Sequence, residues 1–496
     1  MRLGRFSASG TGVYRARRLA RVAALGLAPL LAGCWLRPDP PDLNLDVPGS
    51  YVTARKGPDA SLPALDWWRS FGSRELTLLM EEAQTANLDI AAAIARIDQA
   101  DAQVKIANAT LLPQLDANFS GTRSRTAALG GISRVSSLYN FNLTASYVLD
   151  IWGRNRATLL SEVETAISTR YAKEVVALTT LVTVANAYFN VLDAQDRLRI
   201  ARENLRAASE ILNLIRQRKE AGTASDLELS QQESLVGQQR ASIPPLEIIA
   251  RQNKMALAVL VGRAPEHFIL AGGGTNRIRI PRVAPGLPSD LLDQRPDIRQ
   301  AEANLKSANF SVEAARAAFF PTVQLTGETG FESLALQSLF GPGAWFYTMA
   351  ASASQPLFHG GALFGQLDLA EGKQLEMLQA YRKSVLSAFS DVEQALIAVQ
   401  QEALRERYQR EVVRASQQAF DISRQRLQQG TLDMVTLTQT QQTLFTAEDV
   451  LAQIRLARLQ AVVQLYQALG GGWSPPERTP PPAEPTQPPL VVAPQP

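Results

Sequence analysis

The first third of the chain carries two kinds of hydrophobic pattern, one after the other. From Glu75 to Ala109 apolar residues recur at spacings of three and four, which predicts a helix that Pro113 ends. From Tyr139 to Leu149 apolar residues instead alternate with Asn, Thr and Ser, and a shorter alternation begins at Leu115. Alternation with a period of two predicts strands that have one apolar face and one polar face.

The second half of the chain shows the same two patterns in the same order. Apolar and polar residues alternate from Thr322 to Phe331, and a loop that contains glycine spans Ser338 to Gly343. A second strand with weaker alternation is predicted from Phe346 to Leu357. Each half of the chain therefore predicts one pair of amphipathic strands.

The patterns recur because the second half of the sequence is a copy of the first. Asp89 aligns with Asp297, and the offset is 297 − 89 = 208. A duplication this regular predicts two equivalent structural units that do one job together. The same offset relates these further pairs: Leu112-Pro113 and Phe320-Pro321, Gly222-Thr223 and Gly430-Thr431, Leu229 and Leu437, Gln231 and Gln439, and Gly262 and Gly470.

Two long stretches without proline follow the predicted strands, from Asn155 to Ile243 and from Leu357 to Ser474. The first predicts a helix from Arg154 to about Glu220, which would run about 100 Å at 1.5 Å per residue. Each stretch is predicted to fold back at a left-handed glycine followed by a capping threonine, in Gly222-Thr223 and in Gly430-Thr431. The sequence therefore predicts two pairs of long antiparallel helices.

The predicted strands are too few to close a barrel, because even the smallest single-chain barrels need about eight. The mature chain has no run of eighteen apolar residues, so the sequence predicts no membrane-spanning helix. A membrane crossing would therefore need the strands of several subunits, joined into one barrel. The helices alone also fit a structural coiled-coil envelope lipoprotein, but such a scaffold does not need one amphipathic hairpin in each copy.

The N-terminus has the features of a bacterial lipoprotein signal. Six arginines and no acidic residue lie between Arg2 and Arg21, an apolar segment follows, and Leu31-Ala32-Gly33-Cys34 is a lipobox. Cys34 is the only cysteine, so we predict S-diacylglyceryl and N-acyl (palmitate-type) chains on it and no disulfide. Trp35 after the cysteine, in place of Asp, predicts sorting to the outer membrane.

These patterns divide the chain into six segments. Glycine and proline mark the linker between the copies and the tail, while each copy contains a helix, a strand pair and a long helical hairpin. The segments are a signal peptide (1–33), a lipidated tether (34–72), a first repeat (73–270), a linker (271–288), a second repeat (289–470) and a proline-rich tail (471–496).

The sequence offers little for catalysis. His267 and His359 are the only histidines and neither has the spacing of a zinc site or a catalytic triad. Gly272 to Gly274 lack the Lys and the hydroxyl residue that a phosphate-binding loop needs after them. The formal net charge is only +3, and the six leader arginines account for all of it. We therefore predict no enzyme, no metal, no cofactor apart from the lipid, and no nucleic acid.

Four segments of the sequence resemble one known family. They are Leu287 to Glu302 with its continuation to Pro321, Asp66 to Phe71, Ser146 to Arg154, and Gln355 to Gly361. By these segments the chain is identified as a member of the outer-membrane factor family, the TolC-like efflux ducts, and of its lipoprotein branch of NodT or OprM type. The resemblance covers nearly the whole mature chain.

The resemblance implies a mixed fold, in which a membrane β-barrel continues into a long α-helical coiled-coil barrel. In a homotrimer, each subunit would give four strands to a twelve-stranded barrel and its helices to a periplasmic tunnel. The implied function is the outer-membrane channel of a tripartite efflux system, for example in drug resistance, with a periplasmic adaptor and an inner-membrane pump as partners. The exit duct of a type I protein secretion system is the alternative within the same architecture.

In this family the tunnel closes at the helix turns farthest from the membrane, which correspond here to 222–231 and 430–439. The resemblance therefore implies adaptor contacts at Gly222, Thr223, Gly430 and Thr431. An Asp often occupies the position of Gln439 in this branch, and the amide departs from that pattern. Cargo, pump and adaptor are not identified by the sequence. The residues implied to form the pore gate are Leu227, Gln231, Asp433, Val435 and Gln439.

Overall fold

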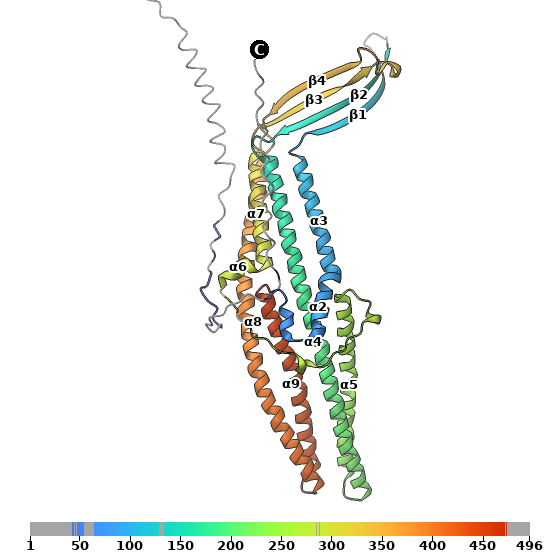
Figure 1. The fold of residues 1–496 in the computed structure, drawn as a ribbon, viewed down its shortest axis with the longest axis vertical. Coiled ribbons are helices and arrows are strands. Elements are labelled where there is room, and N and C mark those ends of the chain that lie inside the picture. Colours follow the sequence, from blue (N-terminus) through green and yellow to red (C-terminus); the bar gives the residue numbers. More distant parts are fainter. Residues whose placement is uncertain are drawn as a thin grey trace, which may run out of the picture. The chain divides into compact units, whose positions relative to one another are not determined.

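The computed structural model describes residues 42–53 apart from 44 and 46, 64–127, 133–283, 285–286, 288–471 and 473. The signal peptide, Cys34 and the tail beyond 473 lie outside the described residues. Figure 1 shows the fold. The tether contains η1 Trp67–Phe71. The long elements of the first repeat are α2 Arg74–Ala86, α3 Leu88–Ala109, β1 Gln114–Ala127, β2 Ser133–Leu149, α4 Arg154–Glu220 and α5 Asp226–Leu260.

The second repeat reproduces the first. The helices α7, α8 and α9 begin and end 208 positions after α3, α4 and α5, so the predicted duplication is confirmed. Four short helices lie between α5 and α7: η2 Pro265–His267, η3 Thr275–Arg277, η4 Pro288–Asp290 and α6 Leu291–Gln294. The second repeat then contains α7 Pro296–Ala317, β3 Thr322–Ser333, η5 Leu336–Ser338, β4 Trp345–Ser354, α8 Ala362–Gln428 and α9 Met434–Ala468.

The chain divides into two compact units. The first comprises residues 1–45, 95–171 and 299–384, and the second comprises 46–94, 172–298 and 385–496. The first unit holds all four strands, and the second holds both helical turns and the linker between the repeats. Four helices, α3, α4, α7 and α8, have one end in each unit.

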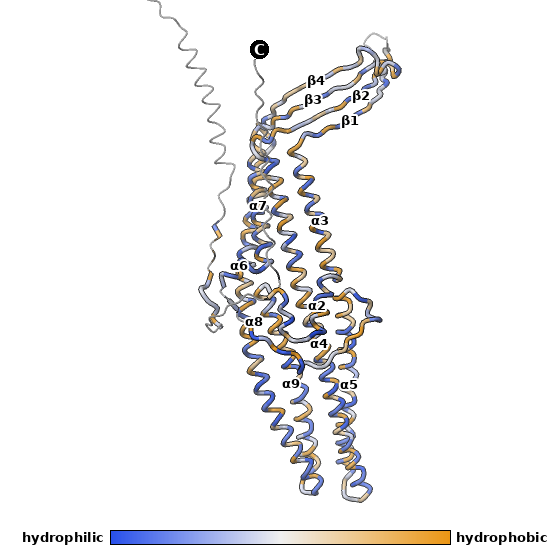
Figure 2. Tube along the Cα trace, in the orientation of Figure 1, coloured by the Kyte–Doolittle hydropathy of each residue, from blue (hydrophilic) through white to orange (hydrophobic). Residues whose placement is uncertain are grey.

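The four strands form one antiparallel sheet in the order β1-β2-β3-β4. β1 and β2 pair without interruption, from Gln114 opposite Ser146 to Ala127 opposite Ser133. Phe331 of β3 lies opposite Phe141 of β2, so the apolar positions of both copies fall on the same face. Hydrophobic and hydrophilic positions interleave along the strands (Figure 2).

The opposite face of the sheet is polar. Asn140 donates to Glu332 at 3.4 Å, and Asn142 donates to Glu328. The apolar face carries large side chains that the rest of the chain leaves exposed, which is the arrangement expected when lipid covers one face and water the other. These exposed side chains include Leu115, Phe119, Leu143, Leu325, Trp345, Tyr347 and Met349.

Three predicted strand ends were wrong, and the pairing explains them. β2 begins at Ser133 rather than at Tyr139, because Ser133 still pairs with Ala127 of β1. β1 continues to Ala127, well beyond the alternation seen in the sequence, because its outer half pairs fully with β2. β4 ends at Ser354 rather than at Leu357, because Thr322, the first residue of β3, lies opposite Ser354 and offers no later partner. Strand length here is set by the neighbouring strand.

The helix predicted from Glu75 to Ala109 is in fact two helices, which Asn87 separates. Asn87 has an extended backbone, with φ −69° and ψ 130°. Its Oδ1 accepts from the backbone N–H groups of Asp89 at 2.9 Å and Ile90 at 3.1 Å, so it caps α3. Its Nδ2 donates to the carbonyl of Leu260 at 2.8 Å. This bond holds the junction between α2 and α3 against the end of α5.

Among the described residues, one helix, α4, has the length and composition to cross a membrane. This differs from the prediction that no helix has these properties. Of the most apolar stretch of α4, 56% is buried inside the protein, as in the core helix of a folded domain. Leu181, Tyr188 and Phe189 of α4 lie in the main hydrophobic core of the second unit. We therefore treat α4 as a core helix.

Aromatic residues from both ends of the chain complete this core. Trp67 stacks on Tyr466 with ring centroids 5.0 Å apart, and Phe71 packs on Phe189 at 5.3 Å. Trp67 and Phe71 are 1% and 0% exposed. Asp66 to Phe71 is one of the segments that resemble the family. Its aromatic side chains pack on α4 and α9 and so complete the core.

Candidate functional site

The first helical turn joins α4 to α5 around Gly222. Gly222 has φ 73°, and its N–H donates to the carbonyl of Lys219 at 2.9 Å. The N–H of Thr223 donates to the carbonyl of Arg218 at 2.8 Å, which completes a Schellman C-cap. Ser225 then starts α5, and its side chain and that of Glu228 form a reciprocal capping box.

The second turn, between α8 and α9, has the same backbone. Gly430 has φ 71°, and the N–H of Thr431 donates to the carbonyl of Arg426 at 3.0 Å. Asp433 starts α9 by accepting from the N–H of Thr436 at 2.8 Å and from its hydroxyl at 2.8 Å. The hydrogen bonds from Thr436 lower the pKa of Asp433 below its usual value, so this cap stays charged.

The left-handed glycines were predicted correctly, and the threonines after them do cap a helix, namely the one that ends at the turn. The hydroxyls of Thr223 and Thr431 donate to the carbonyls of Arg218 and Arg426, at 2.9 and 3.2 Å. Each threonine therefore satisfies the end of the preceding helix, and the following helix is capped two residues later, by Ser225 or Asp433.

The two turns differ in chemistry at one pair of equivalent positions. In the first turn Lys219 and Asp226 form an ion pair at the surface. The equivalent residues of the second turn are Leu427 and Met434, which are 3% and 2% exposed. The first turn is thus charged on its surface, whereas the second is held by apolar packing.

The predicted gate residues lie beside these turns. Leu227 and Val435 are equivalent and are 65% and 61% exposed in the single chain. Val435 and Gln439 are four residues apart and so share one exposed face of α9. Gln231 is half-buried and Asp433 is exposed. The described chain places these side chains on two separate turns, so a constriction built from them requires an assembly.

Behind the turns, both hairpins contribute to one apolar cluster. Two glutamines of the same helices, Gln232 in α5 and Gln441 in α9, are fully buried. Gln232 donates to the carbonyl of Ala208 at 2.9 Å, whereas Gln441 has no hydrogen-bond partner among the described residues. Nothing in the sequence pattern marks either glutamine as buried. The cluster consists of Ala208, Ile211, Leu212, Ile215, Val236, Phe420, Leu427, Met434, Leu437, Leu444 and Phe445.

The sheet has two edges, because β1 and β4 each pair on one side within the chain. β1 is 14 residues long and β4 is 10, so each edge presents a long row of backbone N–H and C=O groups. Such groups must find partners inside a bilayer, where water is absent. Within the chain, one side of β1 and one side of β4 therefore have no strand partner.

A polar layer joins α4 to α9 on the side of the core that leads to the turns. Arg197 donates to Asp449 with Nε at 2.7 Å and with Nη2 at 3.2 Å. The side chain of Asp193 is 6% exposed, and its nearer oxygen lies 4.0 Å from Arg197. Burial raises the pKa of Asp193 to about 6, with Arg197 opposing the shift and Asp449 and Asp196 adding to it.

Asp193→Asn is expected to stabilise the protein in a pH-dependent way. The raised pKa means that the folded state binds this proton more tightly than the unfolded state, so wild-type stability rises as the pH falls through about 6. At pH 7.5 the ionised, buried carboxylate costs about 2–3 kcal/mol. The variant should melt a few degrees higher at pH 7.5, and its advantage should shrink towards pH 5. Thermal unfolding followed by circular dichroism across this range measures it.

The exposed Asp98 supplies the matched control, since Asp98→Asn removes the same charge from the surface. An advantage of Asp193→Asn that stays constant from pH 7.5 to pH 5 would show that ionisation of Asp193 is not the cause.

A duplicated chain with an amphipathic open-edged sheet and two long helical hairpins defines the class of outer-membrane channels that extend into the periplasm. The chain belongs to the outer membrane efflux protein family, which matches residues 79–263 and 287–471. The two matched segments are related by the same offset of 208 as the structural repeats.

Individual relatives agree with this assignment over most of their length. The chain is 37% identical over 453 residues to the pyoverdine export outer membrane protein OpmQ of Pseudomonas aeruginosa, covering 90% of this chain and 95% of OpmQ. It is 31% identical over 458 residues to the toluene efflux pump outer membrane protein TtgC of Pseudomonas putida, covering 90% and 94%.

Solved structures show the same fold. The outer-membrane channel OprN matches with a TM-score of 0.83 at 26% identity, over 88% of this chain and 99% of that one. The open state of the MtrE outer membrane channel of Neisseria gonorrhoeae matches with a TM-score of 0.79 at 30% identity, over 88% and 98%. The predicted fold class and the predicted function, an outer-membrane efflux channel, are thereby confirmed.

Proposed function

We propose that three copies of this chain form the channel. The observation that carries the proposal is the four-stranded sheet whose two edge strands each have one side unpaired within the chain and whose large apolar side chains are exposed. Three such sheets, joined β1 to β4, close a barrel of twelve strands and leave no edge. The polar face with Asn140, Asn142, Glu328 and Glu332 then lines a water-filled lumen.

The helices would continue this lumen into the periplasm and close it at the turns. Each turn brings Leu227 and Gln231, or Val435 and Gln439 beside Asp433, to a face that the chain itself leaves at least partly open. Three-fold repetition would convert each of these positions into a ring. Gly222, Thr223, Gly430 and Thr431 lie at the ends of the hairpins, where a periplasmic adaptor protein would make contact.

The channel works by passive conduction and catalyses no reaction. Members of this family are channels, and the relatives TtgC and OpmQ are named for efflux and export. In this proposal the energy for transport comes from an inner-membrane pump, which acts on the channel through the adaptor. The role of the chain itself is to provide a continuous water-filled path with one closed end.

The cargo consists of small molecules. One relative is named for the export of pyoverdine and the other for the efflux of toluene. A polar lumen that conducts both kinds of cargo has no need of a specific binding site. The alternative of a protein secretion duct finds no support in the names of these two relatives.

The tether supports a lipid anchor on Cys34, which lies outside the described residues. Arg382 of α8 donates to the carbonyls of Leu43 at 2.9 Å and Asp42 at 2.8 Å. Cys34 precedes Asp42 by eight residues, which span at most about 27 Å. Arg382 lies twenty residues, or about 30 Å of helix, from the start of α8 just after β4. The two lengths are similar, so an extended tether would bring Cys34 close to the level at which α8 begins.

The test is the conductance of the purified, lipidated protein in a planar bilayer, together with its oligomeric state. A trimer that gives small closed-state currents with rare openings is expected. The same preparation, from cells supplied with labelled palmitate, should carry label that Cys34→Ala removes. A verified trimer that never conducts would contradict the channel, and label that persists in Cys34→Ala would contradict the anchor.

A further inference from the structure

The linker between the two repeats, residues 271–283, is bound along its length to helices of the second unit. The N–H groups of Ala271 and Gly272 donate to the carboxylate of Glu75 in α2, at 2.7 and 3.2 Å. The N–H of Arg279 donates to the carbonyl of Phe71 at 3.0 Å. The linker is therefore a fixed part of this unit, although its sequence is typical of a loop.

One set of linker contacts is made with the first hairpin. Oδ2 of Asp196 in α4 accepts from the N–H of Thr275 at 2.7 Å and from its hydroxyl at 2.8 Å. Asp196 is 7% exposed and Thr275 is 1% exposed. Gly274, with φ 88°, permits this approach, because a Cβ there would lie 2.5 Å from Oδ1 of Asp196.

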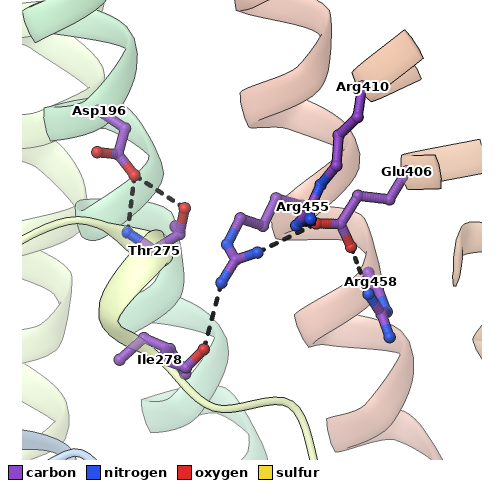
Figure 3. Close-up of polar contacts among 7 residues, drawn as sticks. All are labelled: Asp196, Thr275, Ile278, Glu406, Arg410, Arg455 and Arg458. Carbon is purple, nitrogen blue, oxygen red and sulfur yellow. Dashed lines mark hydrogen bonds and ion pairs between the residues drawn. The ribbon is translucent and has the colours of Figure 1, made fainter. Parts of the chain in front are cut away.

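Three residues further on, the linker binds the second hairpin. Nη2 of Arg455 in α9 donates to the carbonyl of Ile278 at 3.3 Å, while Nη1 donates to Oε1 of Glu406 in α8 at 3.1 Å. Glu406 is 2% exposed and also pairs with Arg410 and Arg458. Figure 3 shows the linker between Asp196 on one side and the arginine cluster around Glu406 on the other.

This series of contacts connects the hairpins through buried, directional bonds. Towards the core, α4 and α9 are held together by apolar side chains such as Tyr188 and Leu459. At the level of Asp196 they are joined instead by charged groups: the linker bridge and the neighbouring Arg197–Asp449 pair. Hydrogen bonds of 2.7 to 3.3 Å are lost when their partners move apart by about 1 Å, whereas apolar contacts weaken gradually.

We propose that Asp196, Thr275 and Arg455 make the linker a restraint that holds the second hairpin against the first and so favours the closed channel. The proposal rests on the proposed function, because it assumes that opening moves one hairpin relative to the other. The relative MtrE has been solved in an open state, so channels of this fold can open. These are positioning residues, remote in sequence from the gate at the turns.

The first test compares Thr275→Val with Thr275→Ser in planar bilayers. Valine has the shape of threonine but lacks the hydroxyl that donates to Asp196, whereas serine keeps it. The backbone N–H of residue 275 donates to Asp196 in all three proteins. We expect Thr275→Val to raise the open probability about tenfold, which corresponds to about 1.4 kcal/mol. Thr275→Ser should behave as wild type.

The second test uses Arg455→Lys. A lysine keeps a positive charge beside Glu406, but its single ammonium cannot also donate to the carbonyl of Ile278 in the fork geometry of arginine. We expect the same rise in open probability as for Thr275→Val. Arg202→Gln is the matched control, because it breaks an ion pair of 2.9 Å between Arg202 and Glu247 within the first hairpin and should leave conductance unchanged.

The heat stability of the trimers, measured in parallel, separates a restraint on opening from a structural role. Normal conductance of Thr275→Val and Arg455→Lys, with or without lower heat stability, would overturn the proposal. An equal rise in Arg202→Gln would overturn it as well. If the wild-type trimer does not conduct, the proposed function itself fails, and that result is distinct from wild-type conduction with unaltered variants.

Discussion

Gly470→Ala is expected to prevent the protein from accumulating as a folded channel. Gly470 ends α9 in a left-handed conformation, with φ 73°, which costs an alanine about 1–2 kcal/mol. The added Cβ would also lie 2.6 Å from the carbonyl oxygen of Gln294 and 3.1 Å from its carbon. Both atoms belong to the backbone and cannot swing away, so the end of α9 must move from α6. We expect a loss of more than about 3 kcal/mol.

The measurement is the amount of protein in the outer-membrane fraction and the temperature at which its trimers dissociate. Gly430→Ala is the matched control, because Gly430 has φ 71° in the same kind of turn but no atom within 4 Å of its would-be Cβ. Gly430→Ala should cost only the backbone strain. Equal accumulation of the two variants would show that the contact with Gln294 is not important.

The same contact exists in the first repeat, which explains why glycine stands at both positions. A Cβ on Gly262 would collide with the carbonyl of Ala86, and Ala86 and Gln294 are equivalent residues. Next to them, Asn87 donates to the carbonyl of Leu260 at 2.8 Å, and its counterpart Arg295 donates to that of Ala468 at 3.1 Å. Both copies therefore hold the start of one helix against the end of another in the same way. Asn87 donates to the carbonyl at the end of α5, and Arg295 donates to the equivalent carbonyl at the end of α9.

Most of the long elements could be predicted from the sequence because local patterns determine them. The bounds of α4, Arg154 and Glu220, follow from a proline-free amphipathic stretch and from the glycine after it. The alternation from Tyr139 to Leu149 likewise predicted the last eleven residues of β2, because one face meets an apolar environment and the other a polar one. Its first six residues, from Ser133, were missed.

The predictions failed where a residue forms bonds that periodicity does not record. Apolar spacing continues across Asn87, so the break between α2 and α3 was missed, although Asn before Leu88-Asp89 is a typical helix cap. The bond between Asp196 and Thr275 joins residues 79 positions apart, and no local signal marks it. Burial of Gln441 depends on the packing of both hairpins and is likewise invisible in one sequence.

The double variant Val435→Ala and Gln439→Ala is expected to leak. The two side chains share an exposed face of α9, so their truncation should change folding stability by less than about 1 kcal/mol. In a trimer they would form two rings at the narrowest level, and their loss would widen a path that excludes ions when closed. We expect a rise of roughly several-fold in closed-state conductance in planar bilayers, and greater sensitivity of cells to large antibiotics.

The equivalent pair in the first repeat, Leu227→Ala with Gln231→Ala, shows whether both copies contribute to the gate. The copies differ beneath these residues: the turn that carries Val435 is packed by buried Leu427 and Met434, whereas the turn that carries Leu227 has an exposed ion pair. An apolar, well-packed support holds a ring in place better than a solvated one. We therefore expect the second-repeat pair to leak more. No change in either double variant, from verified trimers, would place the constriction away from the turns, whereas equal leaks would mean that all six turns of the trimer form it.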